Sequence, residues 1–338
     1  MATIKEIAAL AGVSRGTVDR VLNNRGSVNE KTAQRVRDIA QQLNYRPNKA
    51  GLMLAAQKKN IKIGIILFND SIPFFQEVYE GVYAKEKELA GYNCNLLIRQ
   101  VPSEESAQFD AMEELLKAGI NGLVIAPYNS LYIAAEIDRL TDLGIPVITV
   151  NTDILSKRIA YVGSNYLQSG QTAAGLVGRM TFGDRYVGIV NGFSHILCHS
   201  ERVSGFTKTL TGNYPDIRIM ETVENHDNDD ESYQQVSRLL NDHPEMNVLY
   251  FAAGGIYGGC QAVLDSGRAA SMKIFVHDSV PTTVELIKQN VITATLCQQP
   301  FQQGYLPLDL LSRYLIEGIA PEKELNYLNT EIKIKENL

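Results

Sequence analysis

The side chains near the start of this chain are of the types that bind nucleic acids. Residues 12–26 read GVSRGTVDRVLNNRG, with Arg15 and Arg20 five positions apart. A guanidinium can donate two parallel hydrogen bonds to O6 and N7 of guanine, whereas hydroxyl and amide groups such as those of Thr17 and Asn23 can contact phosphates. This segment therefore indicates binding to DNA or RNA.

A second group of side chains suited to binding follows short apolar runs in the rest of the chain. The stretches IPFF, CHSERVSGF, FVHDSVP and LCQQP combine aromatic rings with charged, hydroxyl and amide groups. Hydrogen-bonding groups around aromatic faces bind compact polyols, because each hydroxyl needs a polar partner and the C–H surface needs an apolar one. These stretches predict a small-molecule site.

Two short helices joined by a tight turn are predicted to present the two arginines. Thr3 and Glu6 have the spacing of a capping box before a helical apolar pattern over residues 4–11. Gly12 can adopt the positive φ of a sharp turn, and Ser14 is a good N-cap for a second helix.

A third helix is predicted to start near Asn29 and to end before Pro47, which disfavours helix at Arg46. The apolar residues predicted to close the core of this small domain are Val13, Val18, Val21, Leu22, Val36, Ile39, Ala40 and Leu43. The pattern is helix, turn, helix and a third helix, which is typical of a DNA-binding domain at residues 1–46.

Charge is distributed unevenly along the chain. The 338 residues carry a net charge of −6, yet the first 60 hold eleven Lys or Arg against four Asp or Glu. That segment therefore carries +7 and the remainder −13. A short basic domain on a larger acidic body is expected of a nucleic-acid binder with a separate regulatory or catalytic part.

The N-terminal 57 residues resemble the DNA-binding domain of the lac repressor family of bacterial transcription regulators. The resemblance rests on TIKEIAALAGVSRGTVDRVLNNRGSVNEKTAQRVRDIAQQLNYRPNKA. It implies that Arg15 and Gly16 help to select operator bases and that Arg20 reads a guanine. The full set of DNA-contacting residues that we expect is Thr3, Ser14, Arg15, Gly16, Thr17, Asp19, Arg20, Asn23, Asn48 and Leu54.

Two of these positions depart from ordinary expectation. Gly16 has no side chain, so Arg15 would have to read its base step alone. Asp19 replaces the serine usual in the resembled family, and its carboxylate could accept from a cytosine N4 or pair with Arg15 or Arg20.

The segment NKAGLMLAAQKKN is predicted to be a linker over residues 47–59. In the resembled family this segment forms a helix on operator DNA and inserts a leucine into the minor groove, and Leu54 stands at the matching position. Gly51 disfavours helix by about 1 kcal/mol relative to Ala, so we expect this segment to be disordered without DNA. The alternative is a plain flexible tether.

The body, residues 60–338, alternates β-rich runs with helical patterns. This alternation predicts an α/β fold of two parallel-sheet subdomains with a cleft between them. We expect the first subdomain at about 60–150 and 299–320, and the second at about 151–298 and 321–338. The segments NTD (151–153) and TLCQQP (295–300) are expected to cross between them.

This body resembles the periplasmic sugar-binding fold, type I, that serves as effector domain in the lac repressor family. In an open α/β sheet the ligand binds beyond the carboxyl ends of the strands. The resemblance implies that aromatic stacking and hydroxyl contacts come from Phe74, Phe75, Asn151, Arg202, Asp227, Asp278 and Gln298.

The pocket is also expected to differ from that of ribose binders. Ile72 and Gly254 stand where those proteins carry asparagines, and Asp227 or His226 stands near an expected aromatic residue. Because Arg202 would also suit an anion, sugar acids and sugar phosphates stay open alongside neutral sugars.

Other chemistry finds weaker support in the sequence. His195, Cys198 and His199 in SHILCHSE could suggest a metal, but they follow a strand and imply no fourth ligand. Lining of the pocket or packing of a loop is the preferred interpretation of these residues. The acidic run ENHDNDDES lacks the central glycine of a calcium loop. The glycine-rich VNGFS and FAAGGIYGG match no nucleotide motif, and no nucleophile with its base is found. We expect no cofactor, no metal and no enzyme activity.

The compartment is expected to be the cytoplasm. The N-terminus lacks the pattern of a signal peptide, and the longest apolar runs are broken within about eight residues, far short of the roughly twenty that span a membrane. Cys94, Cys198, Cys260 and Cys297 show no CxxC spacing and are expected to be free thiols.

The resemblance to the lac repressor family implies a homodimeric transcription regulator, most commonly a repressor in that family, whose affinity for double-stranded operator DNA is controlled by a small carbohydrate or polyol. The tail LNTEIKIKENL has no leucine heptad, so a tetramer is not expected. The alternative is a cytosolic sugar-sensing or solute-binding protein that does not act on transcription.

Overall fold

The structure is a computed structural model that describes residues 2–22, 27–43, 45, 57, 59–69, 72–194 and 196–338. Three predicted DNA contacts, Asn23, Asn48 and Leu54, lie outside the described residues, as does nearly all of the linker 47–59.

Three helices form the N-terminal domain as predicted: α1 Ile4–Ala11, α2 Arg15–Leu22 and α3 Glu30–Gln42. The capping box is present, because Thr3 Oγ1 accepts from the backbone N–H of Glu6 at 3.2 Å and the Glu6 carboxylate accepts from the backbone N–H of Thr3 at 2.8 Å. Gly12 has φ 65°, which lets the chain turn sharply between α1 and α2.

Apolar side chains from all three helices close the small core. Val18, Val21 and Val36 are buried, while Leu22 and Ile39 are partly buried against them. The prediction for Leu43 was wrong, since this side chain is 36% exposed. Because α3 ends at Gln42, Leu43 is the C-cap residue and no longer follows the helical face that packs inward.

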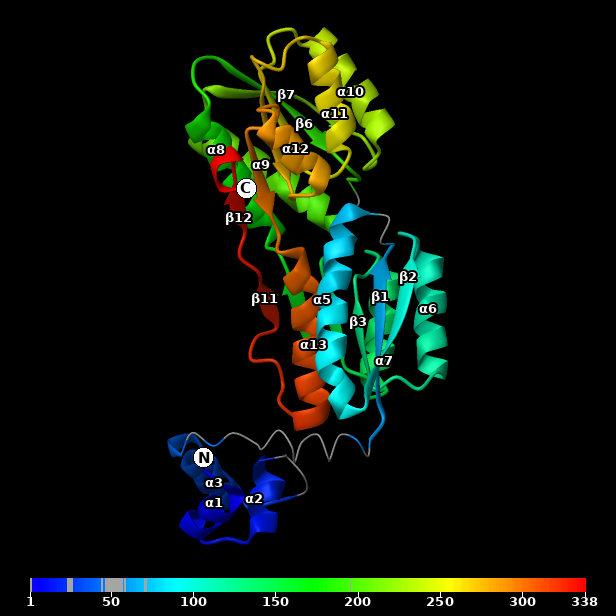
Figure 1. Cartoon of the computed structure of the whole chain (residues 1–338), viewed down its shortest axis with the longest axis vertical. Helices are drawn as coiled ribbons and strands as arrows, with labels where there is room; N and C mark the ends of the chain where they lie inside the picture. The colour runs from blue at the N-terminus through cyan, green and yellow to red at the C-terminus, as the bar shows by residue number, and fades with distance from the viewer. Residues whose placement is uncertain are drawn as a thin grey trace.

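The body contains two six-stranded sheets, each covered by helices on both faces (Figure 1). The first has the strand order β11-β5-β4-β3-β1-β2 and is parallel throughout. Its strands are β1 Ile61–Phe68, β2 Cys94–Val101, β3 Gly122–Ile125, β4 Val147–Val150, β5 Ala160–Gly163 and β11 Leu325–Tyr327. Its helices are α5 Pro73–Leu89, η1 Ala90–Tyr92, α6 Glu105–Lys117, α7 Leu131–Asp142 and α13 Pro300–Glu317.

The second sheet has the order β12-β10-β9-β8-β6-β7, and only β12 pairs antiparallel among its described strands. Its strands are β6 Arg185–Asn191, β7 Ile217–Glu224, β8 Val248–Phe251, β9 Lys273–His277, β10 Ala294–Cys297 and β12 Glu331–Lys333. Its helices are α8 Tyr166–Met180, α9 Leu197–Asn213, α10 Asp229–Asp242, α11 Ile256–Asp265, α12 Pro281–Lys288 and η2 Lys335–Asn337.

The two sheets divide the chain differently from the predicted subdomain boundaries. Strand β5, expected to open the second subdomain, pairs with β4 in the first sheet, and β11 joins the same sheet beside β5. The segment 151–153 is therefore not a crossover. Asp153 accepts two hydrogen bonds from Arg158, both at 2.6 Å, and Arg158 also binds Glu324 at 2.7 Å. These contacts hold the chain in a loop that returns β5 to the first sheet.

The chain passes between the sheets three times (Figure 1). It crosses once between β5 and α8, once between β10 and α13, and once between β11 and β12. The predicted crossover at TLCQQP corresponds to the second of these. The third crossing lies later in the tail than the return to the second subdomain predicted at about residue 321, because β11 still pairs within the first sheet.

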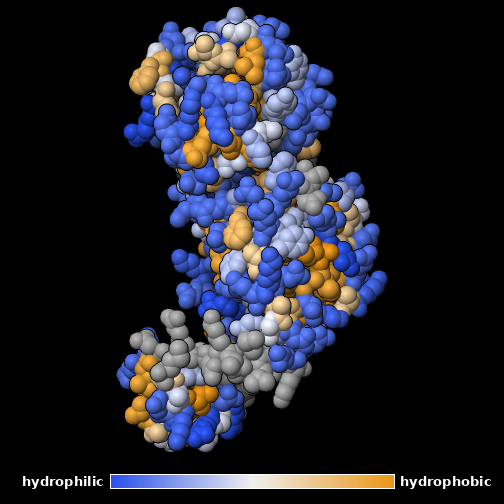
Figure 2. Space-filling model, viewed as in Figure 1, coloured by the Kyte–Doolittle hydropathy of each residue, from blue (hydrophilic) through white to orange (hydrophobic). Residues whose placement is uncertain are grey.

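The body shows a mainly hydrophilic surface in Figure 2, as the buried sheets and their helices would require. Within the described part of the chain, no helix is long and apolar enough to cross a membrane.

Helices α5 and α13 lie side by side on one face of the first sheet (Figure 1). Glycines stand where the two helices approach each other most closely. A Cβ added at Gly81 would lie 2.0 Å from the carbonyl oxygen of Phe301, and one at Gly304 would lie 1.9 Å from that of Val78. Both contacts are with backbone, which cannot yield as a flexible side chain can. The two helices therefore require glycine at both positions.

We predict that Gly304→Ala lowers the free energy of unfolding by about 2 kcal/mol or more, because the added methyl forces α13 away from α5. Urea denaturation followed by circular dichroism measures the change. Gly175→Ala is the matched control: it lies within helix α8, nothing stands within 4 Å of its added Cβ, and we expect no loss and up to about 1 kcal/mol of gain. Equal stability of wild type and Gly304→Ala would contradict the close-packing account.

Candidate nucleic-acid interface and ligand cavity

Helix α2 presents the predicted reading residues to solvent. Arg15, Gly16 and Arg20 are exposed, and Thr17 and Asp19 are partly exposed, opposite the buried valines. The Arg20 guanidinium donates through Nε to the carbonyl of Gly16 at 3.1 Å, and this contact holds the Arg20 side chain along the helix. The exposed cationic face is that expected of a recognition helix.

Two other predicted contacts serve as helix caps in this structure. Ser14 Oγ accepts from the backbone N–H of Thr17 at 3.1 Å, and Thr3 closes the capping box of α1. Burial and, second, the Asp19 carboxylate raise the pKa of Tyr45. The roles of Thr3, Ser14 and Asp19 in DNA binding stay predictions.

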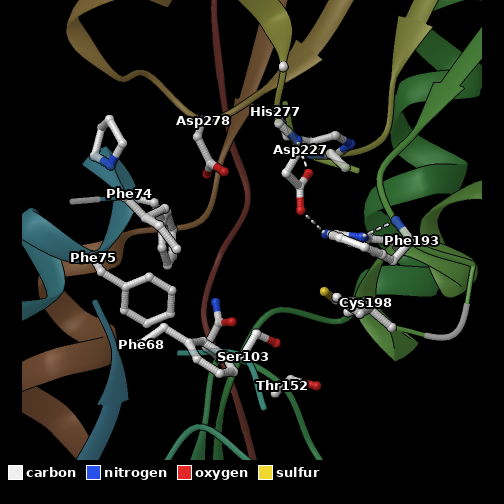
Figure 3. A pocket seen from close by; sticks show the side chains of 18 of the residues that line it. Phe68, Phe74, Phe75, Ser103, Thr152, Phe193, Cys198, Asp227, His277 and Asp278 are labelled. Atoms are coloured by element: carbon white, nitrogen blue, oxygen red, sulfur yellow. Dashed lines mark hydrogen bonds and ion pairs between the residues drawn. The ribbon is translucent and has the colours of Figure 1, made fainter. Parts of the chain in front are cut away.

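A cavity of about 590 Å³ lies between the carboxyl edges of the two sheets of the body (Figure 3). It is lined by residues that follow strands of both sheets, which is where ligands bind in open α/β folds. All seven predicted ligand residues line it: Phe74, Phe75, Asn151, Arg202, Asp227, Asp278 and Gln298. The structure brings these side chains together, while their contact with a ligand stays a prediction.

One wall of the cavity is aromatic. The rings of Phe74 and Phe75 meet edge to face with centroids 5.3 Å apart, and Phe68 meets Phe75 in the same way at 5.5 Å (Figure 3). Phe75 is 5% exposed, so most of this ring belongs to the core of the first subdomain. Phe74 is the more accessible of the predicted stacking pair.

Arg202 lies on α9 and is almost fully buried at the back of the cavity. Its Nη1 donates to the carbonyl of Ala252 at 2.8 Å, and its guanidinium lies over the ring of Tyr166 at 5.0 Å. Burial opposes the charge, but nearby acidic groups, Asp278 first among them, outweigh it and raise the pKa of Arg202. Arg202 is therefore a permanent cation.

Asp278 and Gln298 form a hydrogen-bonded pair opposite Arg202. Gln298 Nε2 lies 2.8 Å from each carboxylate oxygen of Asp278. Burial raises the pKa of Asp278, although Arg202 and Gln298 pull it down. Asp278 also has φ 67°, a strained conformation for a residue other than glycine.

The left-handed backbone at Asp278 explains why His277, which was not predicted from the sequence, also lines the cavity. Successive side chains of a strand point to opposite faces, so His277 and Asp278 should not share a cavity. The turn at Asp278 breaks this alternation, and both side chains line the pocket (Figure 3). His277 Nε2 and the Tyr250 hydroxyl form a hydrogen bond of 2.9 Å. Burial, and second the nearby Arg202 cation, hold the pKa of His277 well below its ordinary value.

Asn151 and Gln303 connect the floor of the cavity to α13. Asn151 has φ 63°, and its Nδ2 donates to Gln303 Oε1 at 3.1 Å. The Asn151 carbonyl accepts from the hydroxyls of Tyr161, at 2.7 Å, and of Tyr166. Gln303 was not predicted, because one amide within an amphipathic helix carries no signal of its contacts.

The histidine-rich stretch SHILCHSE contributes Cys198 and His199 to the cavity wall, while His195 lies outside the described residues. Among the described residues, no group of three His, Cys, Asp or Glu lies together as a metal site would require. The four cysteines Cys94, Cys198, Cys260 and Cys297 are buried free thiols, and burial raises the pKa of Cys198 to about 11.

Comparison with protein families agrees with both regions. Residues 63–318 match the periplasmic binding protein domain family, and residues 3–48 match the lacI family of bacterial regulatory proteins. The chain is a lacI-family regulator. Its fold class, predicted from the sequence as a helical DNA-binding domain with a type I periplasmic-binding-protein body, is confirmed.

Known proteins similar to this lacI-family regulator include repressors and sugar-binding proteins. The probable HTH-type transcriptional repressor ExuR of Bacillus subtilis is 28% identical over 71% of this chain and 69% of its own. Catabolite control protein A of Priestia megaterium is 23% identical over 93% of this chain and 92% of its own.

Among solved structures, a solute-binding protein of an ABC transporter from Burkholderia graminis, in complex with D-arabinose, has a TM-score of 0.76 at 22% identity. The match covers 82% of this chain and 96% of that protein. This likeness establishes the fold of the regulator's body.

We predict that Asp278→Asn makes the ligand-free regulator more heat-stable at neutral pH. The folded state binds the proton of Asp278 more tightly than the unfolded state, so ionising this carboxyl destabilises the fold. The advantage of the variant should be absent near pH 4 and should grow as pH rises through the raised pKa. Melting temperatures from pH 4 to 7.5 test this, with Asp230→Asn, an exposed aspartate outside the cavity, as control. A wild type that melts above the variant at pH 7.5 would refute it.

Proposed function

We propose that this regulator binds a pseudo-palindromic operator as a homodimer, and that a small carbohydrate or polyol in the cavity controls its operator affinity. The observation that carries the proposal is one chain with both an exposed arginine face on α2 and a cavity lined from both sheets. A protein that only sensed sugar would not need the first of these.

The proposal that the ligand is a carbohydrate rests on the make-up of the cavity. Aromatic rings form one wall, and Arg202, Asp278 and Gln298 add hydrogen-bond donors and acceptors to the lining. The structural neighbour from Burkholderia graminis binds D-arabinose in the same fold. The relatives named as repressors support repression as the outcome at the operator.

Control of operator affinity follows from a shift between two arrangements of the subdomains. A ligand that contacts side chains of both sheets binds better when the sheets approach each other, so it favours the closed arrangement. It changes operator affinity only as far as its affinities for the two arrangements differ.

We also propose that the cavity binds its ligand without changing it. Burial keeps Cys198 protonated, with a pKa of about 11, and His277 is engaged by Tyr250. Neither residue is thereby poised as a nucleophile or a base. We propose the cytoplasm as the compartment of this protein, because a regulator of transcription has to reach operator DNA.

We predict that Arg20→Ala loses sequence selectivity and keeps sugar binding. An arginine paired with guanine contributes about 1–3 kcal/mol of discrimination, so the ratio of operator to random-DNA affinity should fall by about tenfold or more. The operator is one selected from random DNA by the wild type, and fluorescence anisotropy measures both affinities.

Arg37→Ala is the matched control for Arg20→Ala, since Arg37 is a half-exposed cation of α3 that pairs with Glu30. It should leave the selectivity ratio unchanged. An unchanged ratio in Arg20→Ala would remove this residue from the reading face.

We predict that Arg202→Ala abolishes the response of operator binding to sugar and leaves sugar-free operator affinity intact. Removing the guanidinium takes away a donor at the cavity, deprives the Ala252 carbonyl of its partner and leaves Asp278 without its nearby cation, so sugar affinity should fall by about 100-fold or more. Isothermal titration and anisotropy measure the two affinities.

Because Arg202 is buried, Arg202→Lys provides a second variant that keeps the charge, and Arg179→Ala on the exposed side of α8 is the control. A normal sugar response in both Arg202 variants would show that the ligand binds elsewhere.

A further inference from the structure

The proton of His199 is fixed by a backbone contact. His199 lies in the first turn of α9, 9% exposed, and its Nδ1 lies 3.1 Å from the backbone nitrogen of Phe193. A backbone N–H can only donate, so Nδ1 is the acceptor and the neutral ring carries its hydrogen on Nε2. His199 Nε2 is therefore a hydrogen-bond donor.

Asp227 places an acceptor opposite that donor. Its Oδ1 accepts from the backbone N–H of Gly254 at 2.7 Å, which fixes the carboxylate. Its Oδ2 lies 3.9 Å from His199 Nε2, too far for a direct hydrogen bond. Asp227 is 37% exposed and lines the cavity, so a ligand can reach this gap.

The gap has the size for one oxygen atom. An oxygen about 2.8 Å from both Nε2 and Oδ2 would see them at an angle of roughly 90°, within the range of a hydroxyl that accepts one hydrogen bond and donates another.

Two glycines make room for this arrangement. A Cβ at Gly192 would lie 2.7 Å from both His199 Nδ1 and Asp227 Oδ1, and one at Gly254 would lie 3.1 Å from Asp227 Oδ1. Neither glycine has a positive φ, so backbone conformation does not require them. The close approach of His199 and Asp227 does.

We infer that His199 and Asp227 together bind a single hydroxyl of the ligand, and that this pair makes the cavity select an uncharged sugar or polyol over a sugar acid, a sugar phosphate or an amino sugar. The inference rests on the proposed function and narrows the class of its effector.

The selection follows from what each group can donate. A carboxylate or phosphate oxygen could accept from His199 Nε2 but has no hydrogen for Asp227 and would be repelled by it. An ammonium could donate to Asp227 but would face the N–H of His199. A hydroxyl alone satisfies both partners.

The charged side chains that line the cavity also disfavour an anionic ligand. Its described lining carries three aspartates, Asp227, Asp229 and Asp278, against one arginine, Arg202. Arg202 already interacts with Asp278, which raises the arginine's pKa. An anionic ligand would therefore add to an excess of negative charge.

The test uses matched sugars on the full-length protein. Glucose and galactose are each measured beside their uronic acids, 6-phosphates and 2-amino derivatives, with D-arabinose and D-ribose added, by thermal shift and isothermal titration. We expect binding by a neutral sugar that exceeds binding of its charged derivatives.

Asp227→Asn replaces the hydrogen-bond acceptor of the His199–Asp227 pair with a donor. Its Oδ1 must still accept from Gly254, so its amide N–H₂ would point at the ligand beside the N–H of His199. We expect the preference for the neutral sugar over its uronic acid to fall by about tenfold or more. Gly254→Ala, which displaces Asp227, should also weaken binding of the neutral sugar, and Asp230→Asn, with the same charge change outside the cavity, should match the wild type.

Tighter binding of a uronic acid or phosphate by the wild type would overturn the inference and leave a sugar-controlled regulator standing. Asp227→Asn with wild-type affinity and preference would overturn it as well. If no sugar of either kind bound or altered operator binding, the proposed function itself would fail.

Discussion

The amide of Gln303 is the contact on which the arrangement of the cavity depends. This side chain is fully buried in α13, where its Oε1 accepts from Asn151 Nδ2 at 3.1 Å and its Nε2 donates to the carbonyl of Gln298 at 3.0 Å. Asn151 follows β4 of the first sheet, and Gln298 follows β10 of the second. Because a buried polar group needs its partners, one amide ties the ends of both sheets to the first turn of α13.

The cavity carries polar groups that the rest of the fold has to tolerate. Among the described residues, Arg202 Nε, His277 Nδ1 and Gln298 Oε1 are buried without a hydrogen-bond partner, and Asp278 is held in a left-handed conformation. Each of these features destabilises a folded chain. Around them, apolar clusters cover both faces of each sheet. Other buried atoms without a partner, such as Ser169 Oγ and Ser232 Oγ, lie outside the cavity lining, but those of Arg202, His277 and Gln298 gather within it.

Much of the fold could be predicted because the strands are short, apolar and regularly separated by helices. The core of the first three helices followed from periodicity, apart from Leu43, which lies just past a helix end. Sequence could not say which sheet a strand joins, since β5 is equally apolar in either, and its place depends on the contact of Arg158 with Asp153. In the cavity, residues that follow strands could be predicted, and His199 was interpreted as pocket lining or loop packing, but its pairing with Asp227 could not be predicted. Its position depends on glycines at 192 and 254 whose purpose only distances reveal.

The three passages of the chain between the sheets limit how the body can move. A single connection would let the two halves rotate, twist and slide independently. Three neighbouring connections suppress twisting and sliding and leave bending as the soft coordinate. Any molecule that bridges the halves then drives the same mechanical displacement, whatever its shape. Under the proposed function, chemical discrimination among such molecules would lie in whether they bind, while the movement passed to the DNA-binding end would be set by the three connections themselves.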